Sequence, residues 1–362
     1  MKEPKSKTQL DAIANIFLVA FSLIACVLAS EALTRIFAPQ FTPRNRYLQY
    51  EYFKVDDSNE RERVFLKNSK QSQISNSGEF NVSIKANSLG FRDEDFGQDT
   101  TFDYIVMGDS FAAGWGVAVE NTAVNLLEER CNLSIANLAI PGADLHNHLN
   151  LLSYARENRI SGKRALIFIT MENDIFPYSF TEESNNYVTK QSYAQANLFA
   201  STILRAKEAL VYRSSLYNFI GALIRSHSAT NRLAKNIGLA ASENEINEYI
   251  KPETSALKSV ALVLQEIDSR IESTFILIPA RHLWAKDKSV RDAFRNQHFQ
   301  VAKYLESQEL DFIDLFARFN ETEKRLNLHY PIDGHWNNDG HKEAFDTIAS
   351  TLNTVSCNQY TD

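Results

Sequence analysis

The stretch Tyr104–Val117, YIVMGDSFAAGWGV, places a short apolar run directly before Gly-Asp-Ser and then a series of small residues. An apolar run of this length that ends at a glycine is typical of a buried β-strand. A serine at the carboxyl end of a strand is either a nucleophile or a turn residue that hydrogen-bonds its own backbone. To act as a nucleophile, Ser110 needs a base and oxyanion donors from elsewhere in the chain.

The strand at Tyr104 begins a repeating pattern of apolar runs separated by amphipathic segments. The five runs that predict strands are Tyr104–Met107, Ser134–Leu138, Ala165–Thr170, Phe275–Ile278 and Phe312–Leu315. The patterns that predict helices cover residues 121–130, 144–157, 255–271 and 341–355. Buried strands that alternate with helices indicate a parallel sheet covered on both faces. We therefore expect an α/β fold, a three-layer α/β/α sandwich with about five parallel strands.

The sheet-forming pattern occupies residues 101–357 of the 362-residue chain. Residues 38–100 are polar and rich in turns, and SGEFNVSIKANSLGF within them alternates as a strand or hairpin does. We expect this segment to be membrane-proximal and to pack on the main domain. Residues 176–253 are too long for a simple crossover between strands. They predict a helical insertion, which either caps the active face or is an embellishment without ligand contact.

The amino-terminal residues 1–37 predict a cytoplasmic tail and a transmembrane anchor. Ala12–Ser30 is apolar apart from Asn15 and its serines, and its nineteen residues can cross a hydrocarbon core about 30 Å thick. The lysines that precede it hold that end in the cytoplasm, so the rest of the chain lies outside it. The alternative is a cleaved signal peptide, because small residues lie near Ala29 and Ala32. Both interpretations export the main domain to the periplasm or the cell exterior.

Charge and cysteine content narrow the function classes. The formal charge of −7 and the pI near 5.7 argue against nucleic acid as a partner, since a protein that binds nucleic acid presents a basic face.

Of the three cysteines, Cys26 lies in the anchor, and Cys131 and Cys357 lie in a compartment that permits a disulfide. A Cys131–Cys357 disulfide is one hypothesis. A catalytic role for Cys131 has no support, because nothing around it resembles an activated thiol site.

The carboxyl ends of parallel strands are where ligands bind in open α/β sheets. The residues that follow the five predicted strands include Ser110, Gly142, Asn173 and the pair Asp333 and His335. These types suit acyl transfer: a serine nucleophile needs a positioned base, and histidine can accept and return a proton near neutral pH. An aspartate bonded to the other ring nitrogen fixes the tautomer. The backbone amides of Ser110 and Gly142 and the side-chain amide of Asn173 would form the oxyanion hole.

Each of these motifs has a purely structural alternative. Gly-Asp-Ser occurs in turns, the Asn173-Asp174 pair can cap a helix, and an Asp and a His near a carboxyl terminus can be surface residues. Their order along the chain is the more specific signal. Arg92 and Arg281 are candidate substrate contacts, with surface or interdomain salt bridges as the alternative for both.

This order resembles the SGNH (GDSL-type) hydrolase superfamily of esterases, lipases and carbohydrate deacetylases. The resemblance covers residues 102–355 without the insertion and rests on GDSFAAGWGV, NLAIPG, MENDIF and DGHWNNDGHKEA. It implies a flavodoxin-like sandwich, no metal or organic cofactor, and roles for Ser110 as nucleophile and first oxyanion donor. It also implies Gly142 and Asn173 as the other donors and His335 as the base.

Two positions depart from the family pattern. Met171 stands where the family usually has a glycine, and Asp333 lies two residues before His335 rather than three. Exported polysaccharide O-acetyltransferases of the alginate type resemble this Asp-x-His-Trp spacing. Uncharacterised membrane-anchored members are also similar around NSLGFRD and GDSFAAGWGV.

Other site types lack their motifs. Residues 108–112 do not read G-x-S-x-G, and the chain has no P-loop. A metal site would have to draw on the cluster His329, Asp333, His335, Asp339 and His341, which shows no defined ligand spacing.

Three functional hypotheses follow. The first is a membrane-anchored serine esterase that hydrolyses an O-acyl ester on a cell-envelope glycan or lipid, with O-acetyl as one candidate. The second is a polysaccharide O-acetyltransferase that uses the same residues, working with envelope-polysaccharide machinery. The third is a glycan-binding or assembly protein without turnover.

Overall fold

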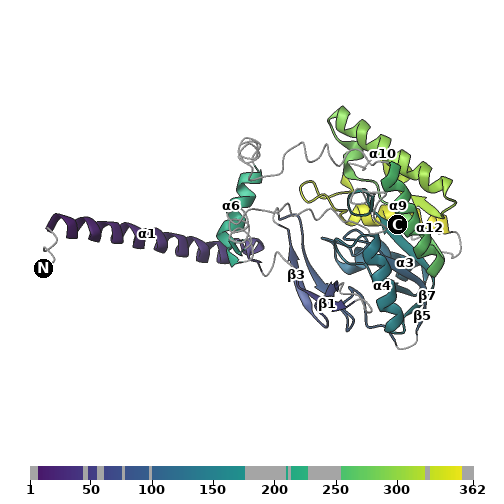
Figure 1. Cartoon of the computed structure of the whole chain (residues 1–362), viewed down its shortest axis with the longest axis horizontal. Coiled ribbons are helices and arrows are strands. Elements are labelled where there is room, and N and C mark those ends of the chain that lie inside the picture. The colour runs from purple at the N-terminus through teal and green to yellow at the C-terminus, as the bar shows by residue number, and fades with distance from the viewer. Residues whose placement is uncertain are drawn as a thin grey trace. The chain divides into compact units, whose positions relative to one another are not determined.

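The computed structural model covers the whole chain, which forms two compact units. The smaller unit comprises residues 1–47 and 194–240, and the larger unit comprises residues 48–193 and 241–362. Figure 1 shows the elements of both. The residues that the structure describes are 7–43, 48–54, 61–75, 78–97, 100–175, 209–210, 213–226, 254–322 and 327–352. Most of the expected insertion at 176–253 lies outside them.

The larger unit contains a five-stranded parallel sheet with the order β6-β5-β7-β8-β9. Its strands are β5 (Thr101–Met107), β6 (Ile135–Asn137), β7 (Ser161–Ile169), β8 (Ser273–Leu277) and β9 (Phe312–Asp314). Numbered along the chain, this order is 2-1-3-4-5, the flavodoxin-like arrangement. The fold is therefore the predicted α/β class, and each of the five apolar runs forms a strand.

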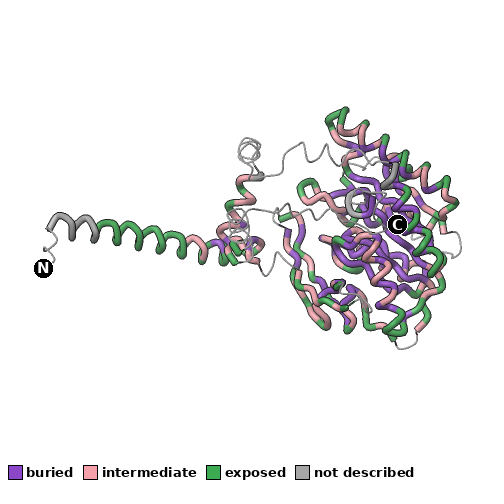
Figure 2. The backbone as a smooth tube through the Cα atoms, in the orientation of Figure 1, coloured by how far each residue is buried: buried purple, intermediate pink, exposed green. Residues whose placement is uncertain are grey.

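The helices cover both faces of this sheet, because successive strand residues point to opposite sides. Ile105 and Met107 of β5 pack in the cluster that holds α4 (Leu145–Glu157) and α9 (Thr254–Arg270). Tyr104 and Val106 pack on the opposite face, with α3 (Ala123–Cys131) and α12 (Asn338–Leu352). The strands of the sheet are buried throughout most of their length (Figure 2). The result is the three-layer sandwich.

The connections between the later strands add shorter elements and one long helix. The π-helical turn η3 (Met171–Ile175) follows β7, and the 3₁₀ turns η2 (Val119–Asn121) and η4 (Arg281–Trp284) follow β5 and β8. Helix α10 (Lys288–Ser307) joins β8 to β9, and α11 (Phe316–Glu321) follows β9. Neither α10 nor α11 was among the helices predicted from the sequence.

Residues 48–97 belong to the same compact unit as the sheet. They form two antiparallel hairpins, β1 (Tyr50–Lys54) with β2 (Arg61–Phe65) and β3 (Lys70–Ile74) with β4 (Asn81–Lys85). The β3–β4 hairpin contains the alternating stretch for which a strand or hairpin was predicted. Val64 and Phe65 of β2 and Ile84 of β4 pack into the same apolar cluster as α4 and α9.

The smaller unit contains helix α1 (Lys7–Phe37), the 3₁₀ turn η1 (Pro39–Phe41) and helix α6 (Ser215–Ser226). Ala14–Phe37 is long and apolar enough to cross a membrane, with a mean hydropathy of 2.4, and a signal sequence would pass the same test. Helix α6 confirms helical structure in the part of the insertion that the structure describes.

Candidate active site

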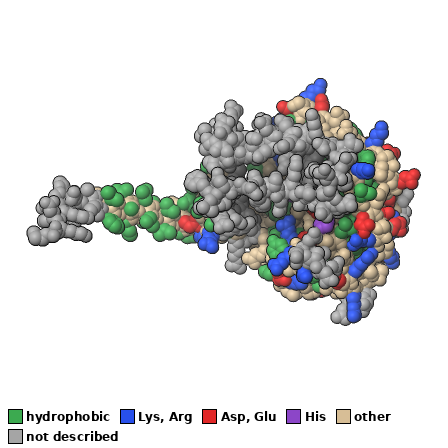
Figure 3. All heavy atoms as spheres, viewed as in Figure 1, with side chains coloured by type: hydrophobic (Ala, Val, Ile, Leu, Met, Phe, Trp, Pro, Cys, Tyr) green, Lys and Arg blue, Asp and Glu red, His purple; other side chains and the backbone are tan. Residues whose placement is uncertain are grey.

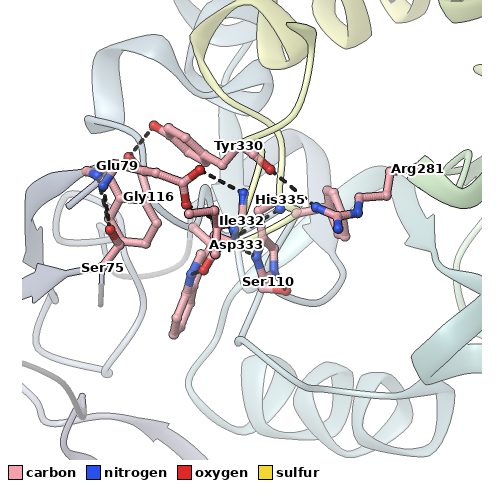
Figure 4. A network of polar contacts seen from close by, with 12 residues as sticks. Ser75, Glu79, Ser110, Gly116, Arg281, Tyr330, Ile332, Asp333 and His335 are labelled. Carbon is pink, nitrogen blue, oxygen red and sulfur yellow. Dashed lines mark hydrogen bonds and ion pairs between the residues drawn. The ribbon is translucent and has the colours of Figure 1, made fainter. Parts of the chain in front are cut away.

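Three side chains form a continuous hydrogen-bonded chain at the carboxyl edge of the sheet (Figure 4). The Ser110 hydroxyl lies 2.8 Å from Nε2 of His335, and Nδ1 of His335 lies 2.5 Å from Oδ1 of Asp333. Because one ring nitrogen faces the hydroxyl and the other faces the carboxylate, the imidazole is oriented to take a proton from Ser110. Residues 225 positions apart in the chain thus meet as the sequence predicted.

The local sequence explains why Ser110 reaches this edge. Strand β5 ends at Met107, and a Cβ at Gly108 would lie 2.7 Å from the Cβ of Ala112 and 2.8 Å from that of Phe168. Only glycine lets the chain leave the sheet so closely. The following turn closes when the Trp115 amide donates to the Ser110 carbonyl at 2.9 Å, which leaves the Ser110 side chain directed at the histidine.

The Asp-x-His spacing is made possible by Gly334, which has a φ of +94°. This left-handed conformation suits glycine and turns the chain sharply between the two triad residues. Oδ1 of Asp333 can then accept from both the ring Nδ1 of His335, at 2.5 Å, and its backbone N–H, at 3.3 Å. The departure from the family's usual spacing therefore still delivers a carboxylate to the imidazole.

Two opposite charges hold the loop that carries the acid and the base. The Glu79 carboxylate, between β3 and β4, accepts from the backbone amides of Ile332 and Asp333 at 2.8 and 2.9 Å. The Arg281 guanidinium donates to the carbonyls of Tyr330 and Pro331 at 3.4 and 3.1 Å. Sequence reasoning missed Glu79, since no motif links this hairpin residue to the catalytic loop.

The environment of Asp333 keeps it ionised. Its burial alone would raise the pKa, but hydrogen bonds and the charge of His335 outweigh this effect, so the pKa of Asp333 lies below its usual value. The Trp115 indole adds a weak contact from Nε1 to Oδ2 at 3.4 Å. Its ring also lies 5.4 Å from that of His335. Trp115 belongs to the stretch Tyr104–Val117, and its position shortly after Ser110 was the only sequence feature that pointed to a place near the site.

Two backbone amides are available as oxyanion donors. Neither the Ser110 nor the Gly142 amide donates to another residue in the part of the chain that the structure describes. Gly142 has a φ of +72°, and a Cβ there would lie 2.7 Å from Nη2 of Arg63, which donates to the Pro141 carbonyl. The backbone of Asn173 belongs to η3, but its side chain lies outside the described structure, so its predicted role stays a prediction.

A buried polar network lies behind Ser110. The Thr170 hydroxyl is 3.1 Å from Oδ2 of Asp109 and 3.2 Å from Oδ2 of Asp174, and the Thr170 amide donates to the same Asp174 oxygen at 2.7 Å. Burial first, and then the charge of Asp109, raises the pKa of Asp174 well above its usual range. Burial lowers the pKa of neighbouring His148 to about 3. This network ties the turn after β5 to the turn after β7.

The structure separates the two arginines that were candidate substrate contacts. Arg92 is 3% exposed, and its guanidinium donates to the carbonyls of Ala113, Gly114 and Val117 at 2.6–2.9 Å. Its burial lowers its pKa to about 10. The expectation of a substrate contact is therefore wrong for Arg92, which holds the loop after Ser110. Arg281 lines the cavity described next.

The triad opens into a cavity of about 360 Å³. Its lining combines groups that follow strands β5, β7 and β8 with the loop before α12: Asp109, Ser110, Phe111, Thr170, Ile278, Ala280, Arg281, His282, Asp333, Gly334 and His335. Ligand cavities commonly have this mixture of apolar walls and a few convergent polar groups.

The structure also shows the surroundings of the candidate metal ligands and the state of two cysteines. Among the described residues, no three histidine, cysteine, aspartate or glutamate side chains are placed to hold a metal ion together. His341 instead accepts from the Ala123 amide at 3.2 Å. Cys26 is free and Cys131 is disulfide-bonded. Its predicted partner Cys357 lies outside the described residues.

A flavodoxin-like sheet with a Ser–His–Asp chain at its carboxyl edge is the arrangement of an α/β serine hydrolase. No protein-family model matches the chain, and no curated protein matches it.

Several solved structures resemble the chain distantly. A member of the lipolytic protein G-D-S-L family from Veillonella parvula is 10% identical, covers 71% of this chain and 100% of its own, and has a TM-score of 0.39. An extracellular lipase from Streptomyces rimosus is 15% identical over 69% of this chain and 99% of its own, with a TM-score of 0.37. A phospholipase A1 from Streptomyces albidoflavus is 12% identical over 68% and 98%, with a TM-score of 0.38. The chemistry must therefore be inferred from this chain's own side chains.

Proposed function

We propose that this protein is an SGNH-type serine esterase that hydrolyses an O-acyl ester of a cell-envelope glycan or lipid. The observation that carries the proposal is the chain of contacts from Ser110 through His335 to Asp333, with 2.8 and 2.5 Å between the paired atoms. The short apolar and polar cavity around it suits a small acyl group such as acetyl. The N-terminal helix would hold the enzyme in the membrane with the catalytic unit outside the cytoplasm.

The geometry supports a two-step acyl transfer. The Ser110 oxygen attacks the ester carbonyl carbon while its proton passes to Nε2 of His335, and the negative charge on the carbonyl oxygen is stabilised by the Ser110 and Gly142 amides. The bond to the alcohol breaks as His335 returns the proton to the leaving oxygen. Water then attacks the acyl-enzyme and gives a proton to His335, which returns it to the Ser110 oxygen as the bond from that oxygen to the acyl carbon breaks and the carboxylic acid leaves. Asp333 remains ionised throughout and stabilises the imidazolium.

The Asp-x-His-Trp spacing favours a second candidate, polysaccharide O-acetylation with the same triad. The first half-reaction is unchanged, and a sugar hydroxyl replaces water in the second. The two candidates differ in the acceptor that reaches the acyl-enzyme and in how well water is excluded.

Covalent labelling tests the proposal. The full chain in detergent should react with a fluorophosphonate and release p-nitrophenol from p-nitrophenyl acetate. Ser110→Ala should abolish both, whereas Ser350→Ala, at an exposed position on α12, should change neither. A folded protein that is not labelled would overturn the proposal and favour a binding role. Acetylation of an added oligosaccharide that exceeds acetate release would assign the transferase.

A further inference from the structure

The amino-terminal unit contains an acidic residue whose partners come from a distant part of the chain. Glu31 lies within the apolar span of α1. Its carboxylate accepts from the Ser215 and Leu216 amides, both at 2.9 Å, and from the Ser214 hydroxyl at 2.8 Å. These groups form the amino terminus of α6, so Glu31 caps a helix that follows it by more than 180 positions.

Additional contacts hold α6 against α1 and against η1, the turn that follows α1. Arg35 pairs with Glu31 at 2.8 Å and donates to the Arg213 carbonyl at 3.0 Å. The Asn218 side chain donates to the Phe41 carbonyl at 3.3 Å, and the Phe219 ring packs edge-on against that of Phe41. Ionisable side chains within a membrane span are almost always paired with other polar groups. The cap on α6 supplies such partners to Glu31.

Helix α6 exposes large apolar side chains to the surroundings. Ile220 is 46% exposed and Leu223 is 51% exposed, and residues 215–224 contain no charged side chain. An exposed apolar face on an amphipathic helix is suited to a hydrophobic surrounding rather than to water. Its 12 residues extend about 18 Å, which is too short to cross a bilayer.

The depth of Glu31 identifies what covers this face. The residues before Glu31 in the apolar span carry no charge from Ala14 onward, and most of the exposed side chains of α1 are apolar over this stretch (Figure 3). The charged pair Glu31 and Arg35 is therefore at the outer boundary of the hydrocarbon, and α6, which is hydrogen-bonded to Glu31, shares that depth. An apolar helix at this depth lies in the interface between headgroups and acyl chains.

We propose that α6 is an interfacial membrane helix docked on a retained α1, and that the lipid surface covers its Ile220 and Leu223 face. This inference rests on the anchor in the proposed function and chooses between its two alternatives. Cleavage after Ala32 would remove Glu31, and cleavage after Ala29 would remove most of the helix that carries it. Either event would leave the apolar face of α6 in water. The mature chain therefore keeps its amino-terminal helix.

Fluorescence quenching in vesicles tests this placement. In a Cys26→Ser background, full-length chains with Leu223→Cys, Leu23→Cys or Lys303→Cys carry an environment-sensitive nitrobenzoxadiazole label. They are inserted into phosphatidylethanolamine–phosphatidylglycerol vesicles whose acyl chains bear a quencher near the headgroup or near the chain end. We expect the 223 label to lose most emission with the shallow quencher, the 23 label with the deep one, and the 303 label with neither.

Three results would overturn the proposal. A 223 label that behaves like the 303 label would place α6 in water. A 223 label quenched as deeply as the 23 label would mean that α6 is inserted across the bilayer. A membrane-associated chain shorter than the intact 41.1 kDa would show that α1 is removed.

A matched pair of variants tests the role of Glu31. Spin labels at Leu33→Cys and Leu223→Cys should give a narrow distance distribution that Glu31→Ala broadens. Glu266→Ala, which removes an equivalent i,i+4 partner of Arg270 on α9, should leave it unchanged. An unchanged distribution in Glu31→Ala would refute docking through Glu31. Hydrolysis of p-nitrophenyl acetate, a soluble ester, is measured in parallel, so that loss of the proposed esterase function and loss of the membrane placement are distinguished.

Discussion

Glu79→Gln should weaken catalysis without touching substrate, because Glu79 acts through the backbone of Asp333. The carboxylate accepts two amide hydrogen bonds, from Ile332 and Asp333 at 2.8 and 2.9 Å. The glutamine keeps one acceptor oxygen, and its NH₂ group would face the other amide donor. A hydrogen bond to a charged group contributes about 1.5–3 kcal/mol. If that energy is lost from the orientation of the acid, kcat falls by roughly 10- to 100-fold, since about 1.4 kcal/mol is a factor of ten.

The assay is hydrolysis of p-nitrophenyl acetate by the full chain, with kcat and KM determined separately. A positioning role predicts a loss in kcat with little change in KM, because the cavity lining retains its composition. Glu94→Gln is the matched control, since Glu94 belongs to the same hairpin region but pairs with Lys85 in an exposed salt bridge. Thermal unfolding of both variants is measured alongside.

Two results would refute the reasoning. If Glu79→Gln is folded and its kcat lies within about twofold of wild type, Asp333 is oriented without Glu79. If Glu79→Gln and Glu94→Gln lose kcat equally, the effect belongs to the hairpin in general. Glu79→Asp, which keeps the charge, should recover part of the activity.

Three further perturbations address the acid, the oxyanion hole and the buried histidines. Asp333→Asn should lower kcat by about 10⁴ while exposed Asp339→Asn changes it little, and equal effects in p-nitrophenyl acetate hydrolysis would show that the acid is another residue. Gly142→Ala should lower kcat by about 10²–10³ at similar KM, because its φ of +72° and the Arg63 nitrogen 2.7 Å from the added carbon displace the amide; an unchanged kcat would exclude this donor. For His341, burial and then nearby positive charges lower the folded-state pKa from 6.5 to about 3. Its stabilising contribution is complete above pH 6.5 and declines as the pH falls toward 3. His341→Gln should therefore reduce the loss of unfolding free energy between pH 6.5 and 5.5 by about 1 kcal/mol, measured by urea unfolding; an identical loss in both proteins would contradict the assigned pKa.

The sheet was predictable because its strands are buried on both faces. Such strands are continuous apolar runs, as in Phe275–Ile278, and each run ends where polar chemistry begins. Ser110 and His335 could be predicted for the same reason: the carboxyl ends of parallel strands share one edge, so residues far apart in sequence meet there. Helix α10 was not predicted, because charged residues occur throughout its length and obscure the apolar pattern. Its residues 294, 298, 301 and 305 are nevertheless buried.

The support around the triad could not be predicted. Glu79 and Arg92 act on backbone amides and carbonyls, which are the same in every sequence and leave no complementary residue pattern. From the sequence alone, Arg92 is either a substrate contact or a structural salt-bridge partner. Only its burial, at 3% exposure, decides between them.

The short Asp-x-His spacing connects these observations. With one intervening residue, the chain has to reverse between acid and base, and Gly334 does this at a φ of +94°. A glycine with positive φ confers no rigidity of its own, because glycine also populates other conformations readily. The required rigidity comes from residues outside the turn. The Glu79 carboxylate accepts hydrogen bonds from the two backbone amides that precede Gly334, and the Arg281 guanidinium donates to the carbonyls of the two residues before those. The hairpin segment at 48–97 thus contributes to the geometry of the Ser110–His335–Asp333 chain, and a protein that lacked this segment would retain the three residues without the Glu79 contacts that help to align them.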